Sequence, residues 1–123
     1  MIKLTYRTHF DAAHYLPDHE TCGKVHGHTY WVEVTFQGPL DSSSGMVLDS
    51  GIMKKEVESV IERFDHKLIN DMGLTPPTAE LIASAILVSL RNLRKQDDRP
   101  STSGYKKVLL WETPSFCVEV EKE

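Results

Sequence analysis

The sequence lacks the features by which membrane, exported and nucleic-acid-binding chains are recognised. No stretch approaches the roughly 20 apolar residues that a membrane helix needs, and residues 1–11 contain no long apolar core of the kind found in signal peptides. Lys and Arg form no basic run and number 14 against 18 acidic residues, which argues against a nucleic-acid partner. We therefore expect a cytoplasmic protein that binds neither membranes nor nucleic acids.

Cysteine is scarce. Cys22 and Cys117 could form one disulfide, but without an export signal we expect both to be free thiols in a reducing compartment. The chain has 123 residues, the size of one domain. A chain of this length buries about two thirds of the surface that its unfolded form exposes, enough for one modest core. No repeat or low-complexity tract divides the sequence, so residues 1–123 are predicted to form a single domain.

Alternation of apolar and polar residues predicts four strands. Residues 2–12 and 26–36 alternate clearly, and the segment between them, 15–24, contains Pro and Gly and is predicted to be a loop. Near the end of the chain, residues 108–112 and 116–120 are predicted to be two strands joined by a turn at Thr113 and Pro114.

Two helices are predicted between the strand pairs. Asp49 or Ser50 can cap a helix that runs to about Phe64, and Thr78 can cap a second helix that runs to about Leu93. The polar segment 94–104 has no periodicity and is predicted to be a flexible connection. The order β-β-α-α-β-β predicts an α+β fold, in which a four-stranded antiparallel sheet carries both helices on one face.

The stretch His26-Gly27-His28 is the most informative part of the chain. A strand directs every second side chain to the same face, so both imidazoles are expected on one face, the apolar one. His14 stands at the end of another predicted strand. Three imidazoles can bind zinc and leave a fourth position open for substrate or water. The alternative for each His is an ordinary imidazole satisfied by hydrogen bonds.

Cys22, four residues before His26, allows two further interpretations. It could complete a closed, structural zinc site together with the three His, which would leave no catalytic position. A thiolate that lies near a dication without binding it would instead act as a base or nucleophile. If Cys22 has neither role, it is a small buried residue.

Asp65-His66 and Glu112 are further candidates. In the first pair, His66 could transfer a proton while Asp65 fixes its tautomer, although adjacent residues at a helix end need not touch and both could be solvated. Glu112 shares the inward parity of Val108 and Leu110. A buried carboxylate needs a partner, and a planar ligand with two adjacent N–H donors would suit it; otherwise its side chain bends into solvent.

Several segments together resemble one enzyme family, that of the 6-pyruvoyltetrahydropterin and 6-carboxytetrahydropterin synthases. The resemblance runs in order through nearly the whole chain, and three residues between the Cys and the first His resemble the bacterial 6-carboxy branch. The matching segments are Phe10-Asp11-Ala12-Ala13-His14, Cys22-Gly23-Lys24-Val25-His26-Gly27-His28, Asp65-His66, Pro77-Thr78-Ala79-Glu80 and Trp111-Glu112-Thr113-Pro114.

The resemblance implies a role for each candidate. It implies zinc as cofactor, catalytic roles for Cys22 as general base and for His66 supported by Asp65, and binding of the pterin ring by Glu112 and Thr78. The metal ligands that it implies are His14, His26 and His28. It also implies the tunnelling fold, assembly into trimers or dimers of trimers, and active sites between neighbouring subunits.

The resemblance further implies a reaction. The substrate would be 7,8-dihydroneopterin triphosphate, and the products 6-carboxy-5,6,7,8-tetrahydropterin, acetaldehyde and triphosphate, a step of queuosine and deazapurine synthesis. The nearest alternative is the 6-pyruvoyl reaction, which keeps the full side chain. Two alternatives of other classes are a zinc-stabilised binding module with Cys22 as fourth ligand and a Cys-His-Asp hydrolase with Cys22 as nucleophile.

Overall fold

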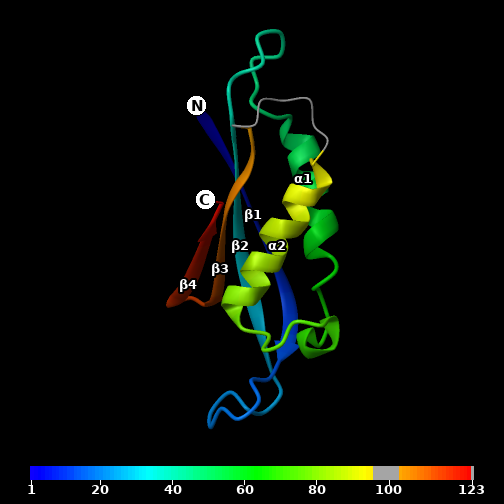
Figure 1. Cartoon of the computed structure of the whole chain (residues 1–123), viewed down its shortest axis with the longest axis vertical. Coiled ribbons are helices and arrows are strands. Elements are labelled where there is room, and N and C mark those ends of the chain that lie inside the picture. Colours follow the sequence, from blue (N-terminus) through cyan, green and yellow to red (C-terminus); the bar gives the residue numbers. More distant parts are fainter. Residues whose placement is uncertain (96–102, 123) are drawn as a thin grey trace.

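Four strands form one antiparallel sheet in the order β1-β2-β3-β4 (Figure 1). The computed structural model describes residues 1–95 and 103–122. The strands are β1 (Ile2–His14), β2 (His26–Gly38), β3 (Gly104–Thr113) and β4 (Phe116–Glu121). The predicted order of elements and the four-stranded sheet are confirmed.

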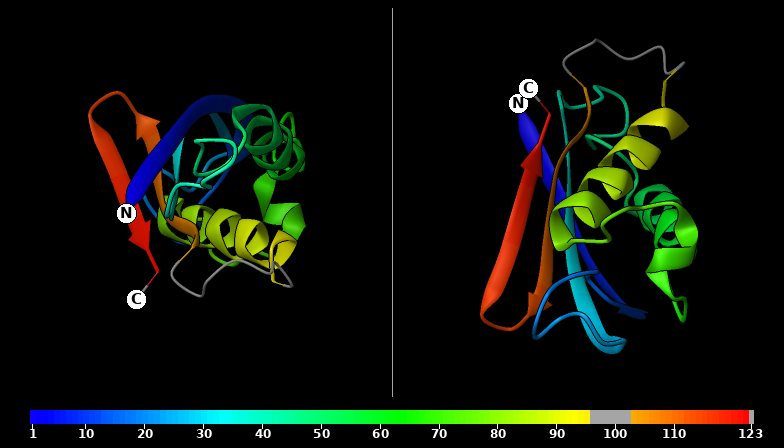
Figure 2. Two further views of the ribbon diagram at one scale, coloured as in Figure 1. Left: turned by 90° about the horizontal axis from the view of Figure 1, so that it is seen from above. Right: turned by 60° about the horizontal axis from the view of Figure 1, so that its bottom comes forward.

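Both long helices cover the same face of the sheet, as predicted (Figure 2). They are α1 (Ser50–Ile61) and α2 (Ala79–Leu93), and a short 3-10 helix, η1 (Ile69–Met72), lies between them. The side chains of Asp49 and Thr78 cap the two helices by accepting the backbone N–H groups of Ile52 and Leu81, at 3.1 and 3.2 Å. Of the two candidate caps for the first helix, Asp49 is therefore the one used, and Thr78 is confirmed as the cap of the second.

The core lies between the sheet and the helices. On β2 the alternate residues Tyr30, Val32, Val34 and Phe36 are all fully buried, because they face the helices. At about 25 cal/mol per Å² of apolar surface removed from water, this contact is the main source of stability for a chain of this size. Packing of this face against the helices also directs the side chains of His26 and His28, because they have the same parity along β2 as the buried residues.

The structure corrects the predicted bounds of several elements. β1 and β2 each run two residues past their predicted ends, to His14 and Gly38. α1 ends at Ile61 rather than near Phe64, because Arg63 and Phe64 donate to carbonyls three residues back, a tighter turn that closes the helix. Phe64 is nevertheless buried, so the apolar spacing continues past the helix. β3 begins at Gly104, within the segment that was predicted to be a connection; residues 96–102 of that segment lie outside the described residues.

The other face of the sheet carries polar and aromatic side chains. The guanidinium of Arg7 lies 4.4 Å from the ring centre of Trp31 and 5.8 Å from that of Trp111, a cation–π arrangement across three strands. The face of the sheet away from the helices is therefore a polar surface with an aromatic centre.

No α-helix in the described part of the chain is long and apolar enough to span a bilayer.

Candidate active site

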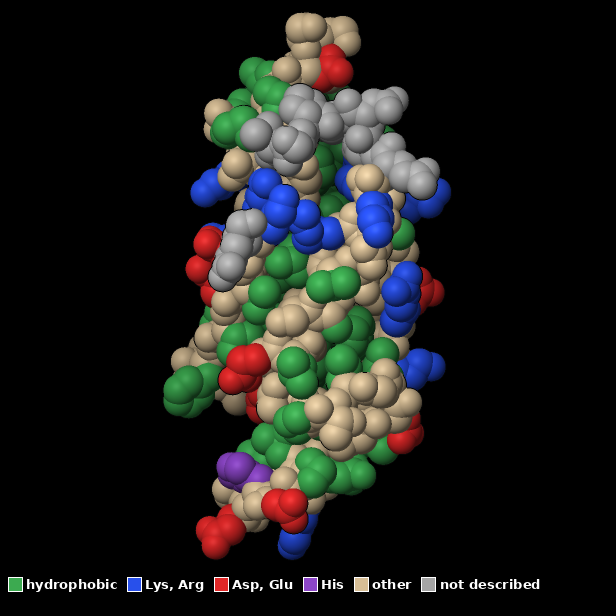
Figure 3. Space-filling model, in the orientation of Figure 1, with side chains coloured by type: hydrophobic (Ala, Val, Ile, Leu, Met, Phe, Trp, Pro, Cys, Tyr) green, Lys and Arg blue, Asp and Glu red, His purple; other side chains and the backbone are tan. Residues whose placement is uncertain are grey.

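The three predicted ligands meet at one end of the sheet. β1 and β2 pair so that His14 lies opposite His26, while His28 lies opposite Ala12, and all three imidazoles project to the helix-covered face. Their ring centres are 4.6 Å (His14–His26), 5.1 Å (His14–His28) and 4.8 Å (His26–His28) apart. Figure 3 shows histidine and acidic side chains at the surface of this end of the molecule.

Two backbone carbonyls fix which ring nitrogen can bind a metal. His14 Nδ1 lies 2.8 Å from the carbonyl oxygen of Pro77, and His26 Nδ1 lies 2.7 Å from that of Lys24. A carbonyl can only accept, so each Nδ1 must carry the hydrogen, and each Nε2 is left with its lone pair. Metal-binding histidines typically donate their other ring N–H in this way, which fixes the orientation of the ring.

Glu112 reaches the same point from β3. Trp111 pairs with Cys117 and Thr113 pairs with Phe116, so the pairing of β3 with β4 skips Glu112. Such a bulge re-aims a side chain and is common beside active sites. The predicted inward parity of Glu112 is confirmed, and the bulge turns its carboxylate to the histidines.

The carboxylate and the imidazoles are close without being hydrogen-bonded. Glu112 Oε1 lies 3.2 Å from His28 Nε2 and 3.8 Å from His14 Nε2. In the described part of the chain, neither Nε2 atom has a hydrogen-bond partner, although both are buried. Burial lowers the pKa of His28, which the nearby Glu112 partly opposes, so its neutral form is favoured. A neutral imidazole is the form that binds metals.

This set of donors fits a divalent metal ion. The candidate donor atoms of His14, His26, His28 and Glu112 all lie within 4.8 Å of one another. Imidazole nitrogens with one carboxylate oxygen are ligands that zinc accepts in proteins, and other divalent ions can also bind such sites. The two buried, unpartnered Nε2 atoms are the structural sign of the fit, because buried polar atoms require a partner.

Cys22 is not part of this group. It lies in the loop before β2, where its N–H donates to His19 Nδ1 at 3.0 Å and its carbonyl accepts the N–H of Leu16 at 2.7 Å. Among the described residues, Cys22 belongs to no group of three or more possible metal donors, and both cysteines are free thiols. The arrangement therefore favours an open site over a closed one with Cys22 as a ligand.

Asp65 and His66 form a direct pair after α1. His66 Nδ1 lies 2.9 Å from Asp65 Oδ2, so these neighbours, which at a helix end need not touch, are in direct contact. The reason is the backbone: the helix has ended, and His66 takes a left-handed conformation with a φ of 58°. Asp65 Oδ1 accepts the Asp11 N–H at 3.0 Å, which lowers the pKa of Asp65, and the His66 N–H donates to the Asp11 carbonyl at 2.6 Å.

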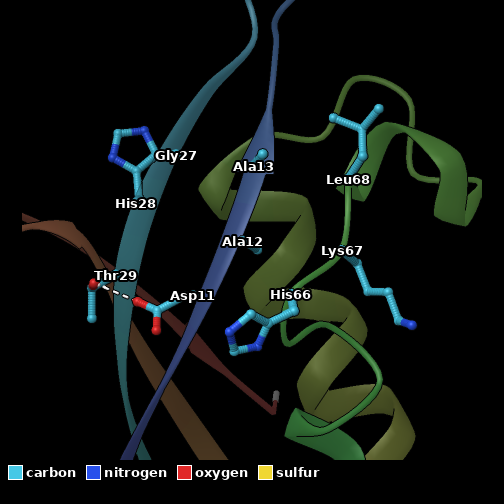
Figure 4. A pocket seen from close by; sticks show the side chains of 9 residues that line it. All are labelled: Asp11, Ala12, Ala13, Gly27, His28, Thr29, His66, Lys67 and Leu68. Carbon is cyan, nitrogen blue, oxygen red and sulfur yellow. Dashed lines mark hydrogen bonds between the residues drawn. The ribbon is translucent and has the colours of Figure 1, made fainter.

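A hollow of about 590 Å³ lies beside this pair (Figure 4). The His66 ring lies next to the Asp11 side chain, whereas the His28 ring projects from β2 away from His66. Asp11 in turn accepts the hydroxyl of Thr29 at 2.5 Å. The hollow is lined by Asp11, Ala12, Ala13, Gly27, His28, Thr29, His66, Lys67 and Leu68. Cys22 is not among these residues, nor is it in the group of possible metal donors that contains His66.

Three parts of the site were missed by sequence reasoning. The carbonyls of Lys24 and Pro77 carry no side-chain signal, and the bulge at Glu112 depends on the pairing of two strands. The hydroxyl of Tyr30 is buried and without a hydrogen-bond partner among the described residues, and burial together with Glu112 raises its pKa. The sequence indicated only that Tyr30, two residues after His28 on the same strand, faces the same side of the sheet.

Comparison with known proteins identifies the family. The family model described as 6-pyruvoyl tetrahydropterin synthase matches residues 3–123. The fold and the histidine cluster thus define an enzyme of the pterin synthase class with the tunnelling fold. The chain belongs to the 6-pyruvoyl tetrahydropterin synthase family.

Individual relatives differ in the reaction that their names state. A dihydroneopterin monophosphate aldolase of Pyrococcus furiosus is 34% identical over 97% of this chain and 96% of its own length. A 6-carboxy-5,6,7,8-tetrahydropterin synthase of Bacillus subtilis is 32% identical over 89% of this chain and 79% of its own. The solved structure of the Caenorhabditis elegans 6-pyruvoyl tetrahydropterin synthase superposes with a TM-score of 0.83 and 26% identity, over 99% of this chain and 96% of that one.

Proposed function

We propose that this protein is a zinc-dependent 6-carboxytetrahydropterin synthase. It would convert 7,8-dihydroneopterin triphosphate to 6-carboxy-5,6,7,8-tetrahydropterin with release of acetaldehyde and triphosphate. The observation that carries the proposal is the cluster of three imidazoles, two of them held with Nε2 free by backbone carbonyls, in a chain of this family. The family relation and the name of the Bacillus subtilis relative support this reaction.

His14, His26 and His28 would hold the metal, which when bound supplies a Lewis acid for the side-chain hydroxyls of the substrate. Cys22 and His66 would move protons between carbon and oxygen atoms of that side chain, and Asp65 would keep the His66 ring oriented through its 2.9 Å contact. Glu112 would accept the two adjacent N–H groups of the pterin ring. Thr78 would contribute a second contact, although its hydroxyl oxygen also caps α2.

The arrangement within one chain supports a site shared between subunits. Cys22 lies outside the group that contains His66, so a second copy would have to bring one of them to the other. We therefore propose a trimer or a dimer of trimers with active sites at subunit contacts. The product would enter queuosine and deazapurine synthesis.

The products decide between the proposed reaction and the 6-pyruvoyl reaction. Incubation with 7,8-dihydroneopterin triphosphate should give acetaldehyde and the mass of the 6-carboxy product. A 6-pyruvoyl product without acetaldehyde would replace the proposal by the reaction after which the family is named.

The aldolase is the second candidate, because the Pyrococcus furiosus relative matches nearly the full chain. Its name implies cleavage of a carbon–carbon bond in dihydroneopterin monophosphate, and the three histidines with the Asp65–His66 pair would suit that chemistry as well. Dihydroneopterin monophosphate should therefore be tested in parallel. Release of a two-carbon aldehyde phosphate from it, with no turnover of the triphosphate, would favour the aldolase.

A further inference from the structure

We infer that Glu112 is the fourth protein donor of the metal site when no substrate is bound, and that the substrate must displace it. The first half of this inference depends only on the metal site; the second half rests on the proposed function. It assigns Glu112 a position in the resting enzyme that differs from its contact with the pterin ring.

The separations between the donor atoms carry the argument. Four donors placed at about 2.0–2.1 Å from a central zinc ion in a tetrahedron lie about 3.4 Å from one another. Glu112 Oε1 lies 3.2 Å from His28 Nε2 and 3.8 Å from His14 Nε2, which brackets that length. These separations are therefore those expected of ligands that share one metal ion.

The electrostatics agree. His14 Nε2 presents a lone pair, because the hydrogen of its ring lies on Nδ1 facing the Pro77 carbonyl. A carboxylate oxygen facing such a lone pair is repelled unless a cation lies between them. The 3.2 Å separation from His28 is within hydrogen-bonding range, yet His28 Nε2 has no hydrogen-bond partner among the described residues. The atoms are therefore arranged as donors around a common centre.

The local backbone allows Glu112 to leave. It is the bulged residue of β3, and the pairing of β3 with β2 ends one residue earlier, at Trp31–Trp111. Its side chain is 26% exposed, whereas that of His14 is fully buried. Because the side chain of Glu112 is partly exposed, its carboxylate can rotate towards solvent. Because its backbone is paired with neither β2 nor β4, the chain can adjust there without breaking the pairing between strands. Its departure converts a site with four protein donors into an open one, which catalysis requires.

Zinc affinity tests the inference without any turnover. Competition with a chromogenic chelator would compare the wild type with Glu112→Gln, and Glu119→Gln on β4 is the matched control because it removes a strand carboxylate outside the cluster. We expect Glu112→Gln to bind zinc about tenfold more weakly or worse, and its Co²⁺ form to change its visible spectrum, with Glu119→Gln unchanged. Equal zinc affinity and equal Co²⁺ spectra for Glu112→Gln and wild type would overturn the inference.

The wild type provides a second measurement, which does not depend on how the variant folds. A crystal structure with zinc and no pterin should place a Glu112 oxygen about 2.0–2.2 Å from the ion, and water in that position would overturn the inference. Adding dihydroneopterin to the Co²⁺ form should change its spectrum as the diol replaces the carboxylate. Because zinc binding is measured without turnover, an inactive protein would refute the proposed function and leave this result intact.

Discussion

At the scale of single residues, the site depends on groups that fix one another. The Pro77 carbonyl orients His14, the Lys24 carbonyl orients His26, and the N–H of Asp11 holds Asp65. Two of these contacts join a side chain to backbone from a distant part of the chain, and the third joins His26 to the loop directly before it. Side-chain identity thus provides the chemistry, and the fold provides its direction.

Cys22→Ala tests whether Cys22 acts on the substrate or holds the metal. We expect the variant to retain about one zinc per chain, because the metal-donor cluster contains Glu112 and not Cys22. Turnover should fall by about 10²-fold or more, the usual contribution of a positioned acid or base. Metal analysis, thermal melting and rate measurement together check this. Loss of zinc together with folding would instead support the structural-zinc module.

Asp65→Asn tests the pair with His66. The Asn oxygen can still accept the N–H of Asp11, so folding and zinc content should stay near wild type, while turnover falls about tenfold or more as the charge beside His66 is lost. Asp65 has a pKa below its ordinary value of 3.8, chiefly because it accepts that N–H, so its ionised form persists below that pH. Because Asp65 stays ionised between pH 5 and 7, any fall in the wild-type rate over that range should also occur in the variant, and a fall that the variant lacks would contradict this assignment.

At the scale of elements, the sequence predicted what periodicity and capping control. Alternation identified all four strands, and Asp49 and Thr78 were correctly predicted as caps. The bulge at Glu112 and the close contact of His66 with Asp65 were not predictable, because they depend on strand register and on one backbone angle. The early start of β3 was missed because Gly104 follows a polar segment, although Tyr105 after it is buried.

The two caps offer a matched pair of substitutions. Asp49→Ala and Thr78→Ala should each lower the free energy of unfolding by about 1 kcal/mol. Only Thr78→Ala should also raise KM, because we expect Thr78 to contact the pterin. Thr78 also directly follows Pro77, whose carbonyl holds His14. Denaturant unfolding and steady-state kinetics check this. An equal effect of the two variants on KM would remove Thr78 from the binding site.

At the scale of the whole molecule, one face of the sheet is exposed and polar. The candidate catalytic residues Cys22 and His66 do not belong to one group of possible metal donors in the described chain. The trimeric barrel that we propose would join sheet edges from neighbouring copies and so remove exposed edges, a common hazard of small sheets. The same assembly would bring Cys22 of one copy to His66 of another. The sequence could suggest this only through resemblance, since one chain holds just its own side of the contact.

Mixing two inactive variants tests the shared site. Cys22→Ala and His66→Ala should each be inactive alone, but oligomers reassembled from equal amounts should regain about a quarter of the wild-type activity, because random pairing of subunits restores that share of sites. Sedimentation should show mixed oligomers of the same size as wild type. If mixed oligomers form and stay inactive, both residues act within one subunit.

The most direct test of the account is reconstitution of metal-free protein with zinc, with turnover of 7,8-dihydroneopterin triphosphate measured at each addition. We expect no activity without metal, a linear rise, and a plateau at one zinc per chain, and His28→Ala should stay inactive throughout because it lacks one of the clustered donors. Full turnover by the metal-free wild type, or undiminished turnover and zinc binding by His28→Ala, would contradict the account.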